Sequence, residues 1–345
     1  MRHGLIQHDF SDGDFSCEMD GVRLAGGAVA LSGEGAEEKT RTGGLESGAV
    51  GLPFPAREMV LTWNSSTPMG AWLDVRFCVG DGGGWSGWYE MGEWGKAGGG
   101  PRWSGDARFG KLEVDILRAA VPFDRVRYRI GLGSACADSP ALKMVSICFS
   151  GEGDEEEGGR AWIGAGGSHD LAVPWLSQFR REVVWDGDMM KAGVCAPTSL
   201  AMVLRYYGCG TSVYEVAKMA RDEGAGIYGN WAYMVAAAGE FGLRAWVERH
   251  SCWEGLLERL RQGIPPILSI AYGKGTFGDF PDRSSEGHLL VLRGWTEDGR
   301  LVCNDPGVEE EKLGRGARFS PEELGKAFFG HGGVAVVVGP RRVTD

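Results

Sequence analysis

The stretch GVCAPTSLAMVLRYYG, residues 193–208, places a cysteine where a helix is expected to begin. Four large side chains recur at the spacing of one helix face, namely Leu200, Val203, Leu204 and Tyr207. Pro197 suits the first helical turn, where its missing N–H costs no hydrogen bond, and Gly208 is a typical stop. Cys195 therefore lies at or just before the helix N-terminus, where unpaired amides and the helix dipole favour an anion. This setting favours the reactive thiolate, although a small buried cysteine beside a helix end would produce the same pattern.

The composition describes a globular protein with an acidic surface and room for two domains. The chain has 345 residues, more than one hydrophobic core ordinarily serves, and 43% of them are hydrophobic. The formal net charge of −11 argues against a nucleic-acid partner, which requires a basic face. The eight cysteines form no CxxC pair and the six histidines no HExxH motif, so we expect neither a disulfide framework nor a metal site. No cofactor is implied.

Targeting signals are not evident in the sequence. No apolar run approaches the length of a transmembrane helix. The opening residues MRHGLIQHDF lack the apolar region of a secretory signal, which favours a cytoplasmic location for the chain as given. If the N-terminus was trimmed, secretion stays open.

Alternation of apolar and polar residues predicts an antiparallel β-sandwich for residues 1–150. Every second residue of LDVRFCV (73–79) is large and apolar, the period of a half-buried strand. KLEVDIL (111–117) and LKMVSICF (142–149) are further candidate strands. The polar, glycine-rich stretch 32–50 is expected to be a long loop.

Six tryptophans fall in this first domain: Trp63, Trp72, Trp85, Trp88, Trp94 and Trp103. Exposed tryptophans can stack on sugar rings, so carbohydrate binding is one interpretation. The alternative is that these large aromatics fill the core and the domain edge. A third possibility is that the domain packs beside a cleft and narrows access to it.

A linker separates the two domains, and the pattern of secondary structure changes beyond it. Residues 151–170 combine a run of acidic residues with many glycines, which is typical of a linker. In residues 171–345 helices mostly precede short apolar strands, an α+β pattern. Helix starts are predicted by three capping boxes and one asparagine cap: Ser212 with Glu215, Ser251 with Glu254, Ser320 with Glu323, and Asn230.

Two residues of the second domain can serve the cysteine as base and orienting group. His288 begins HLLVLRGW (288–295) and Asp305 ends RLVCND (300–305). The turn EDGR between them predicts an antiparallel hairpin, which brings the start of one strand beside the end of the other. In this arrangement His288 takes the thiol proton and Asp305 orients the imidazole. Taken singly, each has a simpler interpretation, His288 as a core histidine and Asp305 as a turn residue.

A glutamine upstream of the cysteine completes the set. Gln178, in VPWLSQF (173–179), can donate its side-chain N–H to an oxyanion, with the backbone N–H of Cys195 as second donor. Its simpler interpretation is a loop residue without a chemical role.

Taken together, VPWLSQ (173–178), GVCAPTSLAMVLRYYG and EGHLLVLRGWTEDGRLVCNDP (286–306) resemble papain-like cysteine peptidases of the bacteriocin-leader-processing, double-glycine kind. The similarity is greater to their free-standing bacterial relatives and covers roughly residues 171–340. The resemblance implies a papain-like domain in which Cys195 is the nucleophile and His288 the base and acid. It likewise implies Asp305 as the orienting group and Gln178 in the oxyanion hole. Papain itself uses an asparagine to orient its histidine, which makes Asn304 the alternative to Asp305.

One position departs from the family pattern. The family usually has glycine directly after the cysteine, whereas this chain has Ala196. Alanine would make a positive φ costly at this position.

The sequence supports one main function and two alternatives. The main prediction is a cysteine peptidase that hydrolyses amide bonds of a peptide or protein substrate. The same thiol chemistry also fits an acyltransferase or amidase. A non-catalytic protein that binds a peptide or glycan is the alternative from another class.

Overall fold

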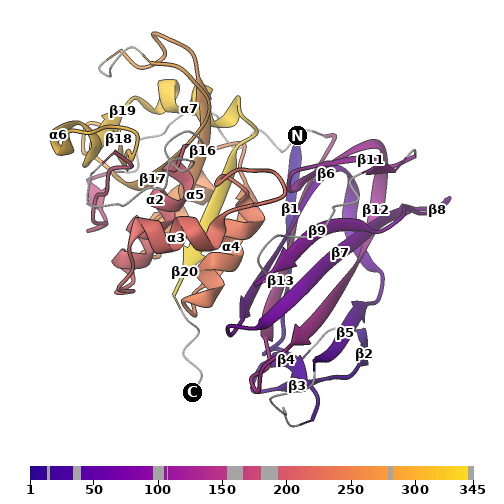
Figure 1. Cartoon of the computed structure of the whole chain (residues 1–345). Coiled ribbons are helices and arrows are strands. Elements are labelled where there is room, and N and C mark those ends of the chain that lie inside the picture. Colours follow the sequence, from indigo (N-terminus) through magenta and orange to yellow (C-terminus); the bar gives the residue numbers. More distant parts are fainter. Residues whose placement is uncertain are drawn as a thin grey trace. The chain divides into compact units, whose positions relative to one another are not determined.

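The computed structural model describes residues 1–13, 16–33, 40–95, 105–106, 108–153, 166–179, 193–278 and 283–340 (Figure 1). The chain divides into two compact units. The first unit comprises Met1–Gly153, Asp222–Gly226 and Asn230–Gly242. The second unit comprises Asp154–Arg221, Ile227–Gly229 and Leu243–Asp345.

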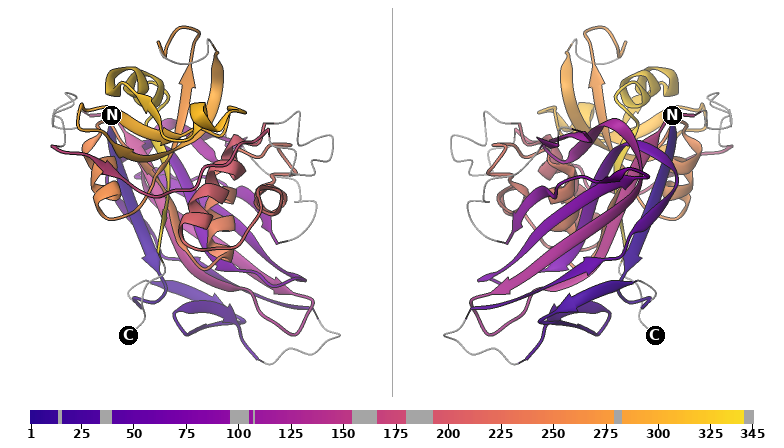
Figure 2. Two further views of the ribbon diagram at one scale, coloured as in Figure 1. Left: turned by 90° about the vertical axis from the view of Figure 1, so that its left-hand side faces the viewer. Right: turned by 90° about the vertical axis from the view of Figure 1, so that its right-hand side faces the viewer.

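The first unit is built from antiparallel strands and one helix. Its strands are β1 (Arg2–Asp9), β2 (Cys17–Asp20), β3 (Val22–Ala25), β4 (Ala28–Leu31), β5 (Arg41–Ser47), β6 (Val50–Ser66), β7 (Ala71–Asp81), β8 (Gly84–Trp85), β9 (Tyr89–Trp94), β10 (Gly105–Asp106), β11 (Gly110–Glu113), β12 (Ile116–Ser134) and β13 (Ala141–Gly151). Its helix is α4 (Trp231–Glu240). The long strands lie side by side in both views of Figure 2.

The long strand β12 pairs with strands that would belong to two separate sheets in a β-sandwich. Its first part pairs with β11 and β6, and its second part pairs with β5 and β7. The register shifts on both sides of Phe123, next to Pro122, which has no N–H to donate to a neighbouring strand. Within the described residues all thirteen strands thus form one hydrogen-bonded network. This pairing does not confirm the predicted sandwich of two separate sheets.

Two local predictions in the first unit were wrong. KLEVDIL is a hairpin rather than one strand, because the chain turns at Val114, which has a φ of 60°. The stretch 32–50 contains strand β5 instead of a loop throughout, and residues 34–39 lie outside the described part. A close backbone approach explains the glycine at position 43 of β5. A Cβ on Gly43 would lie 2.7 Å from the backbone of Gly21. Glycine at this position permits close packing of two backbones.

Helix α4 belongs to the first unit although it lies far from β1–β13 in the sequence. The side chain of Asn230 accepts a hydrogen bond from the N–H of Tyr233, which confirms the predicted cap. The carboxylate of Asp115, in the turn between β11 and β12, accepts hydrogen bonds from two further N–H groups of the first helical turn. Side chains therefore satisfy the donors that a helix N-terminus leaves unpaired.

The C-terminal end and one face of α4 are held by the same unit. Glu240 accepts hydrogen bonds from the indole N–H of Trp94 at 2.9 Å and the backbone N–H of Thr67 at 2.7 Å. Tyr233 packs edge-on against Trp63 and Trp94, with ring centroids 6.0 and 5.4 Å away. Both tryptophans are thus core residues, as one of the three interpretations predicted for such aromatics.

The second unit is a mixed α/β structure around an antiparallel sheet. Its elements are β14 (His169–Asp170), α2 (Cys195–Tyr206), α3 (Val213–Ala220), β15 (Arg244–Arg249), α5 (Glu254–Arg261), β16 (Ile267–Tyr272), β17 (Ser285–Trp295), β18 (Leu301–Asn304), α6 (Glu311–Gly314), β19 (Ala317–Phe319), α7 (Pro321–Phe329) and β20 (Val334–Gly339). The sheet order is β15-β20-β16-β17-β18-β19, with β14 added beside β17. Trp295 lies opposite Leu301, so the hairpin predicted across EDGR is present.

Of the three serine caps predicted in the second unit, two are present. Ser212 caps α3 with both halves of the capping box present, and Ser320 caps α7. Ser251 does not cap α5, whose N-cap is Trp253. Trp253 is buried and stacks on Phe328 at a centroid distance of 5.8 Å, so packing sets the start of this helix.

Candidate active site

Cys195 is the first residue of α2 and is half-buried. The N-cap residue Val194 makes no side-chain cap, and the first turn contains no acidic residue, so the positive end of the helix dipole is not neutralised locally. The hydroxyl of Ser199 donates a hydrogen bond to the carbonyl of Leu289 at 3.1 Å. This bond ties α2 to β17 and holds the helix start beside the residue that follows His288.

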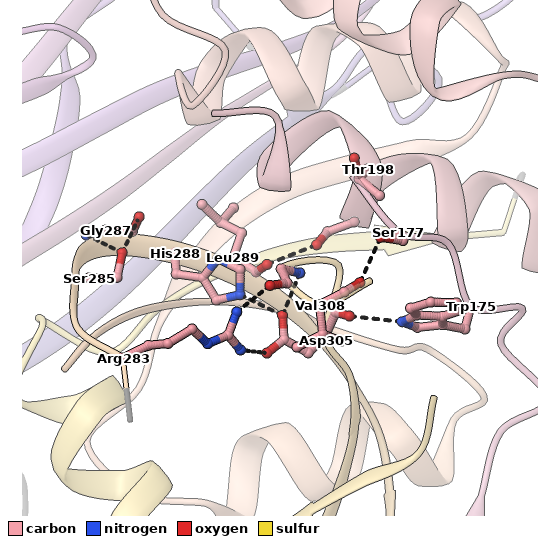
Figure 3. Close-up of polar contacts among 12 residues, drawn as sticks. Trp175, Ser177, Thr198, Arg283, Ser285, Gly287, His288, Leu289, Asp305 and Val308 are labelled. Atoms are coloured by element: carbon pink, nitrogen blue, oxygen red, sulfur yellow. Dashed lines mark hydrogen bonds and ion pairs between the residues drawn. The ribbon is translucent and has the colours of Figure 1, made fainter. Parts of the chain in front are cut away.

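His288 lies in β17 and is only 7% exposed. Its Nε2 is 2.8 Å from Oδ1 of Asp305, the residue directly after β18 (Figure 3). The same Oδ1 accepts a hydrogen bond from the N–H of Gly307 at 2.7 Å. The other oxygen, Oδ2, lies 3.5 Å from the guanidinium of Arg283, which also donates to the carbonyl of Gly307. Both oxygens of the Asp305 carboxylate therefore have partners.

The thiol of Cys195 and the imidazole of His288 are electrostatically coupled, since each shifts the pKa of the other. Because Nε2 faces Asp305, Nδ1 is the ring nitrogen left for the thiol. Burial alone would raise the pKa of Cys195, but the hydrogen bond and charge of His288, with two backbone N–H groups, lower it below its ordinary value. Burial alone would lower the pKa of His288, yet Asp305 and Cys195 raise it to about 10. Both shifts are in the direction that favours a thiolate beside an imidazolium.

The segment that contains Gln178 is fixed against the loop after β18. The indole N–H of Trp175 donates to the carbonyl of Asp305 at 2.8 Å, and the hydroxyl of Ser177 donates to that of Val308 at 2.6 Å (Figure 3). The backbone N–H of Gln178 donates to the same loop at 3.0 Å. Among the described residues, the buried Oε1 of Gln178 has no hydrogen-bond partner. The side-chain amide is therefore held near the carboxylate loop by its backbone and by packing.

Asn304 does not contact His288. Its buried side-chain amide donates to the carbonyl of Val173 at 3.0 Å, and its oxygen accepts from the N–H of Gly316 at 3.0 Å. Asp305 is therefore the residue of this pair that meets the imidazole. Asn304 instead links the end of β18 to the segments that contain Val173 and Gly316.

The departure at Ala196 causes no backbone strain. Ala196 lies inside α2, and Val114 is the only non-glycine residue of the described chain with a positive φ. The conformation for which glycine would be needed does not occur at this position, so the expected cost is absent.

Arg283 is the residue of this site that the sequence did not reveal. It comes just before β17, and only the tertiary structure places its guanidinium on Asp305. Aromatic residues line a small pocket next to it and to His288, namely Tyr272, Phe277 and Phe319. Tyr272 packs edge-on against the imidazole at a centroid distance of 6.4 Å.

Two family models match the chain. Residues 170–317 match the family described as Peptidase_C39 like family. Residues 11–150 match the family described as Peptidase C39 N-terminal domain. Residues 170–317 form a C39-like peptidase domain. Among curated proteins, no match to it was found.

Three solved structures illustrate what this C39-like chain is similar to. A double glycine motif protease from an AMS/PCAT transporter, in complex with the leader peptide, is 21% identical, with a TM-score of 0.34 over 50% of this chain and 94% of its own. A C39-like peptidase from Bacillus anthracis is 18% identical, with a TM-score of 0.37 over 50% of this chain and 98% of its own. A carbohydrate binding module of family 29 is 13% identical, with a TM-score of 0.22 over 44% of this chain and 91% of its own.

The described residues contain no candidate for a membrane-spanning helix or for a metal site. None of their helices combines the length and apolar character needed to cross a membrane. In the same residues, no group of three or more histidine, cysteine, aspartate or glutamate side chains is arranged to hold a metal ion.

Proposed function

We propose that the chain is a cysteine peptidase that hydrolyses peptide bonds with Cys195 as nucleophile. His288 acts as base and acid, Asp305 orients it, and Gln178 donates to the oxyanion. The observation that carries this proposal is that His288 has two partners at once. Its Nε2 lies 2.8 Å from Oδ1 of Asp305, and its imidazole and the thiol of Cys195 shift each other's pKa. A thiol, a base and an orienting carboxylate in series are what thiol catalysis requires.

The reaction follows from the charges of these groups. The thiolate of Cys195 attacks the carbonyl carbon, a C–S bond forms, and the carbonyl electron pair moves to oxygen. The imidazolium of His288 gives its proton to the leaving amine as the C–N bond breaks. A water molecule, deprotonated by His288, then attacks the thioester, which releases the carboxylic acid and restores the thiolate. Asp305 keeps the imidazole in one tautomer and stabilises its cationic form.

The developing oxyanion needs hydrogen-bond donors, and two N–H groups are candidates for this role. The backbone N–H of Cys195 lies at the start of α2, where helix N–H groups have no intrahelical acceptor. Gln178 is anchored to the loop that carries Asp305, and its Oε1 makes no hydrogen bond within the described residues. We assign its side-chain N–H as the second donor.

The domain organisation is part of the same proposal. Residues 171–345 form the peptidase domain, residues 1–150 an accessory domain, and residues 151–170 the linker between them. Helix α4 lies within the peptidase part of the sequence and is held by the first compact unit. The accessory domain is thus expected to be required for a stable peptidase.

A peptide library tests the activity. Wild type is compared with Cys195→Ser on a mixed peptide library, and new peptide termini are read by mass spectrometry. The proposal expects termini that appear only with wild type and with the control Cys252→Ser, which alters another half-buried cysteine. Equal product patterns for wild type and Cys195→Ser would refute a cysteine peptidase.

Two further measurements separate the alternatives. An added amine nucleophile that enters the product in preference to water would identify an acyltransferase. Iodoacetamide labelling at pH 6 separates an enzyme from a binding protein, because a thiolate–imidazolium pair reacts faster than free cysteine. Labelling of Cys195 at or below the rate of free cysteine would favour a protein that binds peptides without cutting them.

A further inference from the structure

The tryptophans of residues 1–150 fall into two groups. Trp63 and Trp94 are buried in the core, at 0% and 4% exposure. Three others are only half-buried: Trp72, Trp85 and Trp88. Trp103 lies outside the described residues. The half-buried group requires an explanation other than filling the core.

These three tryptophans gather on the outer face of the sheet around β12. The even-numbered residues of β12 from 126 to 132 are buried, so the odd-numbered ones face away from the core. This outer face of β12 carries Arg127, Arg129, Gly131 and Gly133. The rings of Trp85 and Trp88 lie over the guanidinium groups of Arg127 and Arg129, at 4.3 and 4.4 Å.

Glycines open a furrow in this face. Strand register places Gly131 opposite Gly44 of β5 on one side and opposite Asp74 of β7 on the other. Because neither glycine has a side chain, the layer of side chains is interrupted there, and a groove follows this line. Two positions further along β12, Gly133 lies opposite Trp72.

Ion pairs form the polar sides of the furrow. Arg76 donates two hydrogen bonds to Asp74, at 3.1 and 2.8 Å. Arg129 donates two to Glu46, at 3.0 and 2.6 Å. Each pair presents guanidinium N–H donors beside carboxylate acceptors, and all four residues line the groove.

Aromatic rings stand at both ends of the furrow. The indole of Trp72 covers Gly133, because a Cβ there would lie 2.2 Å from two atoms of that ring. At the other end, Trp88 lies against Arg129. Arg129 and Gly133 are four strand residues apart, roughly 14 Å. This length suits a short chain of rings rather than a single small molecule.

We propose that this furrow binds a neutral oligosaccharide. A neutral sugar offers hydroxyl donors and acceptors to the paired charges and an apolar ring face to the indoles. Glu18 and Asp20 also line the groove, so an anion would meet four carboxylates. The guanidinium groups of Arg76 and Arg129 are already paired with Asp74 and Glu46. The carboxylates thus disfavour an anionic ligand, and the polar groups together with the indole rings suit a neutral sugar. This binding site is independent of the peptidase proposal.

Titration calorimetry with the full-length chain tests the site. The probes are the soluble tetrasaccharides of β-1,4-linked glucose, xylose, mannose and galactose, with trigalacturonate as an anionic probe. Saturable binding of at least one neutral probe is expected. Gly131→Val should weaken it about tenfold or more, because the added side chain fills the furrow. A Cβ at Gly131 meets only Asp74, at an ordinary 3.5 Å, so the fold accepts the change.

Two more variants complete the design. Trp72→Ala removes one aromatic end and should also weaken binding about tenfold. Arg57→Ala is the matched control, since Arg57 pairs with Glu152 and does not line the groove. The proposal is overturned if no neutral probe binds at about 10 mM, if trigalacturonate binds more tightly than every neutral probe, or if Gly131→Val binds as wild type does.

Discussion

Oδ1 of Asp305 lies 2.8 Å from Nε2 of His288, although His288 lies in β17 and Asp305 directly follows β18. The N–H of Gly307 donates to the same oxygen, and Arg283 pairs with the other. The carboxylate is thus held from three sides and directed at the imidazole. Among the neighbouring groups, Asp305 therefore raises the pKa of His288 most.

Asp305→Ala is expected to lower kcat by at least about 10²-fold, since an imidazole without its carboxylate loses orientation and charge stabilisation. Because Asp305 raises the pKa of His288 to about 10, its removal lets the imidazolium lose its proton at lower pH. The alkaline limb of the kcat/KM profile should therefore move to lower pH. Asp298→Ala, an exposed aspartate of the same hairpin, should leave the profile unchanged. An unmoved alkaline limb in Asp305→Ala would contradict this role.

Gln178→Ala is expected to lower kcat by about 10² while KM changes little, as for the loss of one oxyanion donor. The rate of Cys195 alkylation should stay at the wild-type value, because Gln178 does not set the charge of the thiol. Steady-state kinetics and iodoacetamide labelling measure the two effects separately. A parallel loss of kcat and of labelling would instead indicate a damaged site.

Arg283 is expected to act as a positioning residue through Asp305. Its positive charge helps to keep the pKa of Asp305 below the ordinary value, after the larger effect of His288. In Arg283→Ala the pKa of Asp305 rises, so the acid limb of the kcat/KM profile should move to higher pH. Arg283→Lys should restore part of the shift, since it keeps the charge. A profile equal to wild type with a lower Tm would assign Arg283 a structural role only.

Asp115 is expected to make stability depend on pH. Burial raises the pKa of its carboxyl to about 6, although N–H groups of α4 oppose the shift. The folded protein therefore keeps a proton that the unfolded chain loses at lower pH. As pH rises from about 4 to about 6, stability should fall by up to about 3 kcal/mol through this group.

Asp115→Asn removes that titration. The difference in Tm between Asp115→Asn and wild type should grow in favour of the variant as pH rises from 4 to 7. Asp124→Asn, on the exposed part of β12, is the matched control and should show a constant difference. A constant difference for Asp115→Asn as well would show that Asp115 does not titrate in this range.

The glycines of β5 show where sequence reasoning failed in the first unit. A polar stretch with several glycines is typical of a loop, yet residues 41–47 form a strand. Gly43 is needed because the backbone of Gly21 approaches it closely, and nothing in the local sequence reports that approach. The local sequence likewise does not reveal that β12 pairs with β6 in its first part and with β7 in its second part.

Local sequence determined much of the second unit. The caps at Ser212 and Ser320, the helix that begins at Cys195 and the hairpin across EDGR depend on residues within one or two turns of chain, so pattern and propensity suffice. The choice between Asp305 and Asn304 was different. Asn304 ends β18 and Asp305 directly follows it, and only the hydrogen bonds of Asn304 to Val173 and Gly316 leave Asp305 to meet His288.

The sequence by itself determined the helix that presents Cys195, the strand that carries His288 and the order of the motifs, because each is encoded by neighbouring residues. The tertiary structure alone decided that Arg283 pairs with Asp305, that α4 belongs with the first unit, and that three tryptophans face outward beside a glycine furrow. These features join residues distant in the chain. They depend on how whole elements pack, and a one-dimensional pattern does not contain that information.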